Sequence, residues 1–259
     1  MKSALILCGG RGTRMGPRGA NLPKALLPVQ GKPILWYIMG RLYRAGVRHF
    51  ILPLGYHGHE IAAWLKSVRL DDCRIDAVDT GPNTEIGKRL AMVRDFLPEN
   101  GSFALTNGDA LFDFDVEAFF AFHESSNAMA TLCTTSAISQ FGLLIERNGV
   151  VQDFARSSHI STVSTVEHGE GAVGSIYSGI AALRAGALDA ANIEKAADFE
   201  IDLFHAMIGM GRLGRFEIKG YWHAIDTPKE HDLINAALGW RAAGARRLAA
   251  SLDGFAQPR

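Results

Sequence analysis

An apolar run close to the N terminus ends abruptly in a glycine-rich, basic segment. Residues 3–8 read SALILC and are followed directly by Gly9 and Gly10, a pattern that predicts a buried strand ending in a tight loop. Glycines allow backbone N–H groups to approach an anion closely, and a helix that starts at such a loop adds partial positive charge. The segment 8–24 also supplies the cationic side chains Arg11, Arg14 and Lys24. These features predict a phosphate-binding site at the end of the first strand.

The first 127 residues alternate between short apolar runs and helical patterns. The patterns predict strands over 3–8, 49–54, 74–79 and 103–106, and helices over 33–45, 59–67, 87–96 and 115–124. Strands and helices in alternation are typical of an α/β fold with a Rossmann-like, mostly parallel sheet, whose ligands gather at the carboxyl ends of the strands.

The texture changes beyond residue 127. Short β-rich segments at 128–134, 141–146 and 150–154, with Asn148-Gly149 as a hairpin turn, predict a β-rich extension of the sheet. Residues 157–174 are polar and predict a long loop. A helix over 200–210, a strand over 215–218 and a long Ala-rich helix over 228–252 follow, the last packing on the outside or on another subunit. We expect one domain over 1–259, divided at 127 and 227.

Composition limits the partners and the compartment. The 259 residues contain 27 Lys and Arg and 27 Asp and Glu, so no global charge favours a nucleic acid or an anionic membrane. The first residues hold too few apolar positions for a signal peptide, and no later run could span a bilayer. Cys8, Cys73 and Cys133 lack CxxC spacing, which favours reduced thiols. We therefore expect a cytoplasmic protein without nucleic-acid or membrane partners.

The glycine-rich segment can be tested against two common nucleotide motifs. The dinucleotide fingerprint G-x-G-x-x-G needs a third glycine where this chain has Met15, and a P-loop needs a Lys-Ser/Thr pair that residues 12–17 lack. The P-loop is excluded, and a nicotinamide-dependent dehydrogenase is a weak alternative. On the residues alone, a purely structural glycine turn with solvated arginines stays open.

The pattern G-G-x-G-T-R at 9–14, followed by P-K-A-L-L-P-V-Q-G-K-P at 23–33, resembles the sugar-phosphate nucleotidyltransferase family. Residues 31–39 (GKPILWYIM) are especially similar to glucose-1-phosphate cytidylyltransferases. The similarity continues at 50–56, 79–81, 87–90, 107–109 and 221–227. It thus extends over most of the chain, to about residue 240.

The resemblance implies a role for each matching residue. Gly9, Gly10, Gly12 and Thr13 would wrap the nucleotide through their backbone, Arg14 would grip the departing pyrophosphate, and Lys24 would contact the α-phosphate. Further nucleotide contacts are implied for Leu7, Gly81, Gly87, Arg89, Asn107 and Gly108. The alternative for Arg89 is a solvated position in the first turn of a helix.

Two aspartates match the metal ligands of the family. Asp109 and Asp226 would hold Mg²⁺, an ion that prefers hard oxygen ligands and bridges phosphates. Asp109 could instead belong to a turn or cap a helix, and Asp226 could cap the helix that begins near residue 228. His57 and His59 lack a third ligand nearby, so we interpret them as ordinary loop histidines.

The acceptor side departs from the family. Family members usually carry Glu-Lys-Pro after the strand equivalent to 150–154, whereas this chain reads FARSS at 154–158. Arg156 is the candidate replacement for the missing lysine, because a guanidinium binds phosphate well. Tyr177 and Gly179 are the other acceptor-binding candidates.

The predicted function is transfer of a nucleotidyl group, CMP being favoured, from a nucleoside triphosphate to a sugar 1-phosphate, with release of pyrophosphate. Such chemistry needs positioning and charge neutralisation but no side-chain nucleophile. The alternatives within the class are UTP, GTP or dTTP as donor, or a non-sugar acceptor such as a cyclitol phosphate. The alternative of another class is a non-catalytic nucleotide-binding regulatory subunit. The expected partners are the triphosphate and the phosphorylated acceptor, with homo-oligomers possible.

Overall fold

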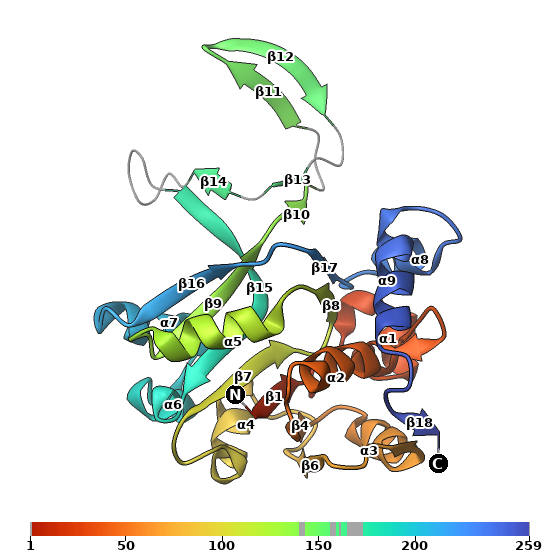
Figure 1. Cartoon of the computed structure of the whole chain (residues 1–259), viewed down its shortest axis with the longest axis vertical. Helices are drawn as coiled ribbons and strands as arrows, with labels where there is room; N and C mark the ends of the chain where they lie inside the picture. The colour runs from red at the N-terminus through yellow and green to blue at the C-terminus, as the bar shows by residue number, and fades with distance from the viewer. Residues whose placement is uncertain (1, 140–142, 156–158, 161, 165–172, 259) are drawn as a thin grey trace.

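Helices cover both faces of a twisted central sheet, and a narrow ribbon of strands extends away from this body (Figure 1). The structure is a computed structural model that describes residues 2–139, 143–155, 159–160, 162–164 and 173–258. In this part of the chain, no helix combines the length and the apolar composition that crossing a bilayer requires.

The central sheet has the strand order β16-β9-β15-β7-β1-β4-β6. Neighbouring strands run parallel except around β15, which is antiparallel to both β7 and β9. This arrangement confirms the predicted α/β fold with a mostly parallel, Rossmann-like sheet. The strands are β1 (Ser3–Leu7), β4 (His49–Leu54), β6 (Arg74–Asp79), β7 (Ser102–Asn107), β9 (Ala130–Thr135), β15 (Val173–Arg184) and β16 (Leu213–Glu217).

Each face of the sheet carries its own buried cluster. Ala4 and Ile6 of β1 belong to one cluster and Leu5 to the other, as expected when successive side chains point to opposite faces. The first face is covered by α2 (Ile34–Arg44), α3 (Gly58–Ser67), α5 (Val116–Ser125) and α9 (Trp240–Ser251). The second is covered by α4 (Ile86–Met92), α6 (Ala187–Ala190) and α7 (Phe199–Gly209).

The projecting ribbon contains the predicted hairpin. Strands β11 (Leu143–Arg147) and β12 (Val150–Ala155) pair antiparallel, and the turn residues Asn148 and Gly149 have φ angles of 53° and 77°. Two adjacent positive φ angles are characteristic of a tight hairpin turn, so this prediction is confirmed. Pairing of β10 (Ala137–Ile138) with β13 (His159–Ile160), and of β14 (Thr162–Ser164) with β15, shows that a loop over 157–174 was wrong for the described residues of that range.

The C-terminal region is not one long helix. It forms α8 (Pro228–Asn235) and α9, separated at residues 236–239, where Gly239 has a φ of 108° that no helix allows. Trp240, the first residue of α9, packs edge-on against the Tyr221 ring at a centroid distance of 6.2 Å. The prediction failed because the Ala-rich composition masked a single glycine that reverses the chain.

Short elements complete the fold, and several of them were not predicted. The helical ones are η1 (Thr13–Met15), α1 (Pro17–Asn21), η2 (Lys24–Leu26), η3 (Arg94–Phe96) and η4 (Ile193–Lys195). The strands pair as β2 (Pro28–Val29) with β3 (Lys32–Pro33), β5 (Val68–Arg69) with β18 (Gln257–Pro258), and β8 (Ala110–Asp113) with β17 (Tyr221–Ala224).

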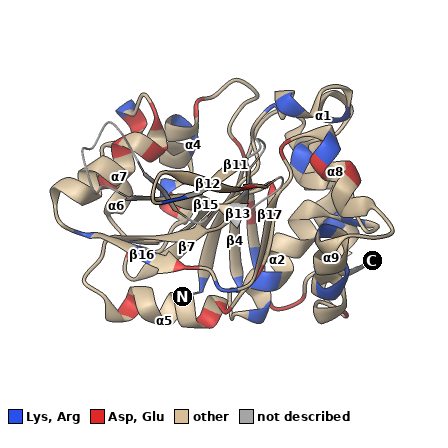
Figure 2. Ribbon diagram, turned by 90° about the horizontal axis from the view of Figure 1, so that it is seen from above, with Lys and Arg blue, Asp and Glu red and all other residues tan. Residues whose placement is uncertain are grey.

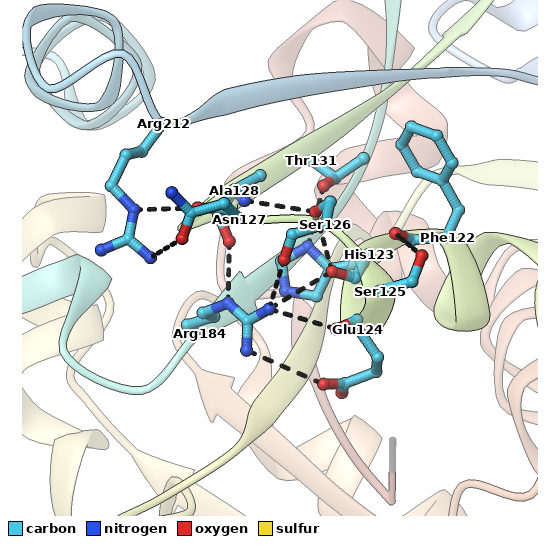
Figure 3. Close-up of polar contacts among 10 residues, drawn as sticks. All are labelled: Phe122, His123, Glu124, Ser125, Ser126, Asn127, Ala128, Thr131, Arg184 and Arg212. Carbon is cyan, nitrogen blue, oxygen red and sulfur yellow. Dashed lines mark hydrogen bonds and ion pairs between the residues drawn. The ribbon is translucent and has the colours of Figure 1, made fainter.

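The link between α5 and β9 is held by arginines from other strands of the sheet. Arg184, at the end of β15, donates from Nε to the carbonyl of Ala128 at 2.9 Å and from Nη2 to that of Ser126 at 2.8 Å (Figure 3). Arg212 donates to the carbonyl of Asn127 at 2.9 Å. These bonds satisfy carbonyls that the end of α5 leaves unpaired.

Candidate active site

A cavity of about 600 Å³ opens at the carboxyl ends of β1 and β7, where a parallel sheet places its ligands. The glycine-rich segment forms one wall of it. Twelve residues that the sequence predicted lie in its lining: Leu7, Gly9, Gly10, Gly12, Thr13, Arg14, Lys24, Arg89, Asn107, Gly108, Asp109 and Asp226.

The donor loop, residues 9–16, has a fixed shape. Gly12 and Gly16 have φ angles of 60° and 56°, which glycine adopts without strain. The N–H of Met15 donates to the carbonyl of Gly12 at 2.9 Å, and the Met15 side chain is fully buried. A Cβ on Gly19 would lie 2.5 Å from the same carbonyl, so α1 can pack this closely only through a glycine. The loop is therefore held by packing and backbone bonds.

Lys24 lies between the two predicted metal ligands. Its ammonium Nζ donates to Asp109 Oδ2 at 2.8 Å and to Asp226 Oδ1 at 2.7 Å. Its side chain is 13% exposed, so both contacts are sheltered from solvent. Arg14 Nη2 lies 3.1 Å from the same Oδ1 of Asp226. Two cations and two carboxylates thus converge at one point of the cavity.

A short antiparallel ladder brings the two aspartates together. Strands β8 and β17 pair Ala110 with Ala224, and the N–H of Ile225 donates to the carbonyl of Asp109 at 3.0 Å. Asp109 and Asp226 are therefore fixed by backbone pairing, although 117 positions separate them (226 − 109).

Asp226 does not cap the following helix. The cap of α8 is Thr227, whose Oγ1 accepts from the N–H of Glu230, while Glu230 Oε2 accepts from the N–H groups of Asp226 and Thr227 at 2.8 Å. This capping box holds the Asp226 backbone and leaves its carboxylate for Lys24 and Arg14. Asp109 lies in the turn between β7 and β8, so it caps no helix either.

Arg89 is a buried cation beneath the donor loop. Its Nη1 donates to Thr80 Oγ1 at 2.5 Å and to the carbonyl of Leu54 at 3.1 Å, and the residue is 5% exposed. A Cβ on Gly9 would lie 2.8 Å from that Nη1. Burial lowers the pKa of Arg89 below its ordinary value, and no protein arginine loses its proton near neutrality. The alternative of a solvated helical turn is thus wrong for Arg89.

Cys8 lines the cavity but is not a nucleophile. Burial raises the pKa of its thiol to about 12, so the thiolate is absent at neutral pH. The site therefore acts through charges and backbone donors, as nucleotidyl transfer requires.

The nucleotidyl transferase family matches residues 3–238 of the chain, which include this whole constellation. This chain belongs to the nucleotidyl transferase family. The predicted resemblance to sugar-phosphate nucleotidyltransferases is confirmed, and the protein is a nucleotidyltransferase enzyme.

Three relatives show the range of the family. The glucose-1-phosphate cytidylyltransferase of Salmonella typhimurium is 29% identical over 248 residues, which cover 88% of this chain and 92% of that one. The mannose-1-phosphate guanylyltransferase catalytic subunit beta of Xenopus tropicalis is 29% identical over 88% of this chain and 62% of its own. A Bacillus anthracis structure described as a glucose-1-phosphate thymidylyltransferase superposes with a TM-score of 0.67 at 17% identity, covering 100% of this chain and 98% of the other.

Some predicted residues of this nucleotidyltransferase lie outside the lining that the described part of the chain forms. Gly81 has a φ of 83° and donates its N–H to Asp79 Oδ1 at 2.9 Å, which shapes the turn after β6. A Cβ on Gly87 would lie 2.5 Å from the carbonyl of Ile193, so Gly87 allows α4 to pack on η4. Nucleotide contacts by these two glycines stay predictions.

The predicted acceptor residues lie on β15 or outside the described residues. The Tyr177 ring packs edge-on against Phe204 with centroids 5.4 Å apart, and burial raises the pKa of its hydroxyl well above the ordinary value. Gly179 has a φ of 76° and packs on Asn107, whose Nδ2 would lie 2.7 Å from an added Cβ. Gly179 thereby supports a residue of the cavity wall. Arg156 lies outside the described residues.

The opposite wall contains residues that sequence reasoning did not combine. Arg11 bonds the side chain of Asn83, and its guanidinium lies 5.0 Å from the centroid of the Tyr56 ring. Asn83 and Arg11 both line the cavity. The polar character of residues 80–85 was the only signal, because three separate loops meet here. His57, also in this region, lies 3.0 Å from the carbonyl of Ala20, and the described residues contain no cluster of three or more candidate metal ligands.

Proposed function

We propose that this enzyme transfers a nucleotidyl group, CMP being favoured, from the triphosphate to a sugar 1-phosphate, giving an NDP-sugar and pyrophosphate. The observation that carries the proposal is the convergence of Lys24, Asp109 and Asp226 in a glycine-lined cavity. The similarity to a glucose-1-phosphate cytidylyltransferase over 92% of that protein's length supports the donor and the acceptor class.

In the proposed reaction, an oxygen of the acceptor phosphate attacks the α-phosphorus of the triphosphate. The bond from the α-phosphorus to the oxygen that bridges to the β-phosphate breaks, and its electron pair leaves with pyrophosphate. Both reactants are anions, so the protein contributes mainly by neutralising and aligning them. The buried, protonated thiol of Cys8 supports a direct transfer, since no thiolate competes for the α-phosphorus.

The two cations have different freedom. Arg14 is 72% exposed and can follow the departing pyrophosphate, whereas Lys24 is 13% exposed and stays at the centre of the site. Lys24 therefore suits the α-phosphate, where positive charge must be in place before attack. The N–H groups of the donor loop supply further donors to the phosphates.

The two carboxylates fit a divalent cation. Both already contact one ammonium, Nζ of Lys24, at 2.7–2.8 Å, so a single cation can be contacted by both. Asp109 and Asp226 would hold Mg²⁺, which takes oxygen ligands. When bound, the ion would neutralise phosphate charge and orient the triphosphate.

The acceptor would enter from the side of β15. Glu200, in the first turn of α7, is a half-buried carboxylate whose pKa is raised by burial and by the nearby charges of Asp198 and Asp109. A partly desolvated acid beside the catalytic aspartate suits a neutral sugar hydroxyl. Under this proposal 1–259 works as one domain, in which 1–127 binds the nucleotide, 128–227 binds the acceptor and 228–259 closes the structure.

The choice of base follows the relatives more than the geometry. Arg89 presents donors beneath the donor loop, and donors suit the O2 and N3 acceptors of cytosine as well as guanine O6. Relatives named for guanylyl and thymidylyl transfer keep GTP, dTTP and UTP as alternative donors. A cyclitol phosphate remains the alternative acceptor.

The test is pyrophosphate release with CTP, UTP, GTP and dTTP, each against a panel of sugar 1-phosphates and cyclitol phosphates with magnesium. We expect the highest kcat/KM with CTP and a hexose 1-phosphate. A higher value with another donor or acceptor would replace that part of the proposal. Tight triphosphate binding without turnover for every pair would contradict it and favour a regulatory role.

A further inference from the structure

Arg18 connects the donor loop to the helix that follows Asp226. It lies on α1, directly after the loop, and α1 and α8 are neighbours (Figure 2). Its Nη1 donates to the carbonyl of Pro228 at 3.1 Å and to His231 Nδ1 at 3.0 Å, while Nη2 lies 2.8 Å from Asp232 Oδ1. One guanidinium therefore reaches three acceptors on the first turns of α8.

The first turn of α8 is the same element that fixes Asp226. Glu230 Oε2 accepts from the N–H of Asp226 at 2.8 Å, and Thr227 caps the helix. A side chain docked on this turn is therefore placed relative to Asp226 as well. Arg14, four residues before Arg18, contacts the Asp226 carboxylate at 3.1 Å. Arg18 closes a ring that contains both functional residues.

His231 extends the connection to the segment that carries Lys24. Since arginine donates and does not accept, His231 Nδ1 accepts the bond from Arg18 and Nε2 carries the proton. Nε2 donates to the carbonyl of Pro28 at 2.8 Å, and Pro28 begins β2, two residues after η2 ends. The neutral imidazole thus joins the donor loop, α8 and the chain that follows Lys24.

We propose that Arg18 is a positioning residue of the nucleotidyl transfer, which sets the placement of Arg14 against Asp226 and Lys24. The inference rests on the proposed function for its catalytic meaning. Asp232 is 65% exposed, so its ion pair contributes little. The carbonyl of Pro228 and His231 Nδ1 are the acceptors that position the guanidinium.

The test compares Arg18→Met with a matched control, Arg94→Met. Arg94 pairs with Asp189 away from the cavity, and its side chain is 37% exposed against 38% for Arg18. For the triphosphate with the highest wild-type turnover, we expect Arg18→Met to lower kcat/KM at least tenfold. The KM of the acceptor should stay within twofold, and Arg94→Met should leave both values unchanged.

Two further variants separate positioning from simple structural support. Arg18→Lys keeps the charge but cannot span three acceptors, so it should recover only part of the lost kcat/KM. Asp232→Asn removes the exposed ion pair alone and should stay within threefold of wild type. Equal losses in Arg18→Met and Asp232→Asn would overturn the assignment to the helix acceptors.

A readout that needs no turnover keeps this inference separate from the proposed function. Hydrogen exchange of the amides in residues 12–19 should be faster in Arg18→Met than in wild type and unchanged in Arg94→Met. If wild type shows no turnover with any of the four triphosphates, the proposed function fails while the exchange result still decides the link. Equal exchange and equal affinity for CTP in wild type and Arg18→Met would overturn the inference.

Discussion

The guanidinium of Arg89 lies directly against the backbone of Gly55. A Cβ on Gly55 would be 2.3 Å from Arg89 Nη1 and 2.3 Å from the carbonyl of Gly9. Distances this short are not tolerated, so the donor loop, the end of β4 and the buried arginine fit together only through glycine. The cavity floor is therefore assembled from three segments that must pack simultaneously.

We expect Gly55→Ala to lower the free energy of unfolding by about 1–3 kcal/mol, the usual cost of overpacking. It should also weaken CTP binding, because Arg89 and Gly9 both line the cavity. The measurements are urea unfolding and calorimetric titration with CTP. Gly209→Ala is the control: Gly209 is helical, and nothing lies within 4 Å of its added Cβ. A Gly55→Ala protein as stable as wild type would contradict the packing argument.

The contacts of Lys24 predict a large loss of activity without a matching loss of folding. We expect Lys24→Ala and Asp109→Asn each to lower kcat by about 10³-fold or more, because each removes charge from the point where the phosphates would meet. Pyrophosphate release measures kcat, and circular dichroism checks the fold. Lys66→Ala, at the end of α3, is the charge-matched control. Near-normal rates in both site variants would refute the mechanism.

Much of the donor half could be predicted because its signals are local. The apolar run before Gly9 and the helical pattern after Pro33 each depend on neighbours in sequence, and both elements occur within two residues of the predicted bounds. The same holds for the hairpin turn at Asn148, where two residues specify the backbone. Local propensity and tertiary packing agree at these positions.

The remaining features depend on contacts between distant segments. The β8–β17 ladder is short, and its strands are brought together by the tertiary fold, so no periodicity revealed that it fixes Asp109 beside Asp226. Arg89 resembles any charged residue in the first turn of a helix, yet it is buried because Gly9 and Gly55 make room for it. Sequence patterns do not record such space.

The α5–β9 link predicts a stability effect far from the site. Arg184 bonds the carbonyls of Ser126 and Ala128, and its Nη1 lies 3.9 Å from Glu124 Oε2 (Figure 3). Removing the guanidinium leaves those carbonyls without their donor, so Arg184→Met should lower the free energy of unfolding by about 2–4 kcal/mol. Arg246→Met, which loses a single exposed bond of 3.3 Å, should change it by less than about 0.5 kcal/mol. Urea unfolding of both variants tests the difference, and equal values would contradict it.

Two buried histidines predict a loss of stability in mild acid. Burial lowers the pKa of His123 and of His223 from 6.5 to about 4 each. Nε2 of each ring is buried without a partner among the described residues, so a second ring proton would find no acceptor. Between pH 6.5 and 4 the unfolded chain binds protons that the folded chain does not, and stability therefore falls as the pH falls.

Each histidine should remove up to about 1.4 kcal/mol of unfolding free energy per pH unit across that window, with no further change from either group below pH 4. Urea unfolding at several pH values measures the slope. In His123→Gln the slope should fall by nearly one proton, because glutamine does not titrate. His59→Gln is the control, since His59 is 74% exposed and its loss should leave the slope unchanged. An unchanged slope in His123→Gln would mean that His123 is already protonated in the folded enzyme near neutral pH, which its buried contact with Thr131 Oγ1 at 2.8 Å argues against.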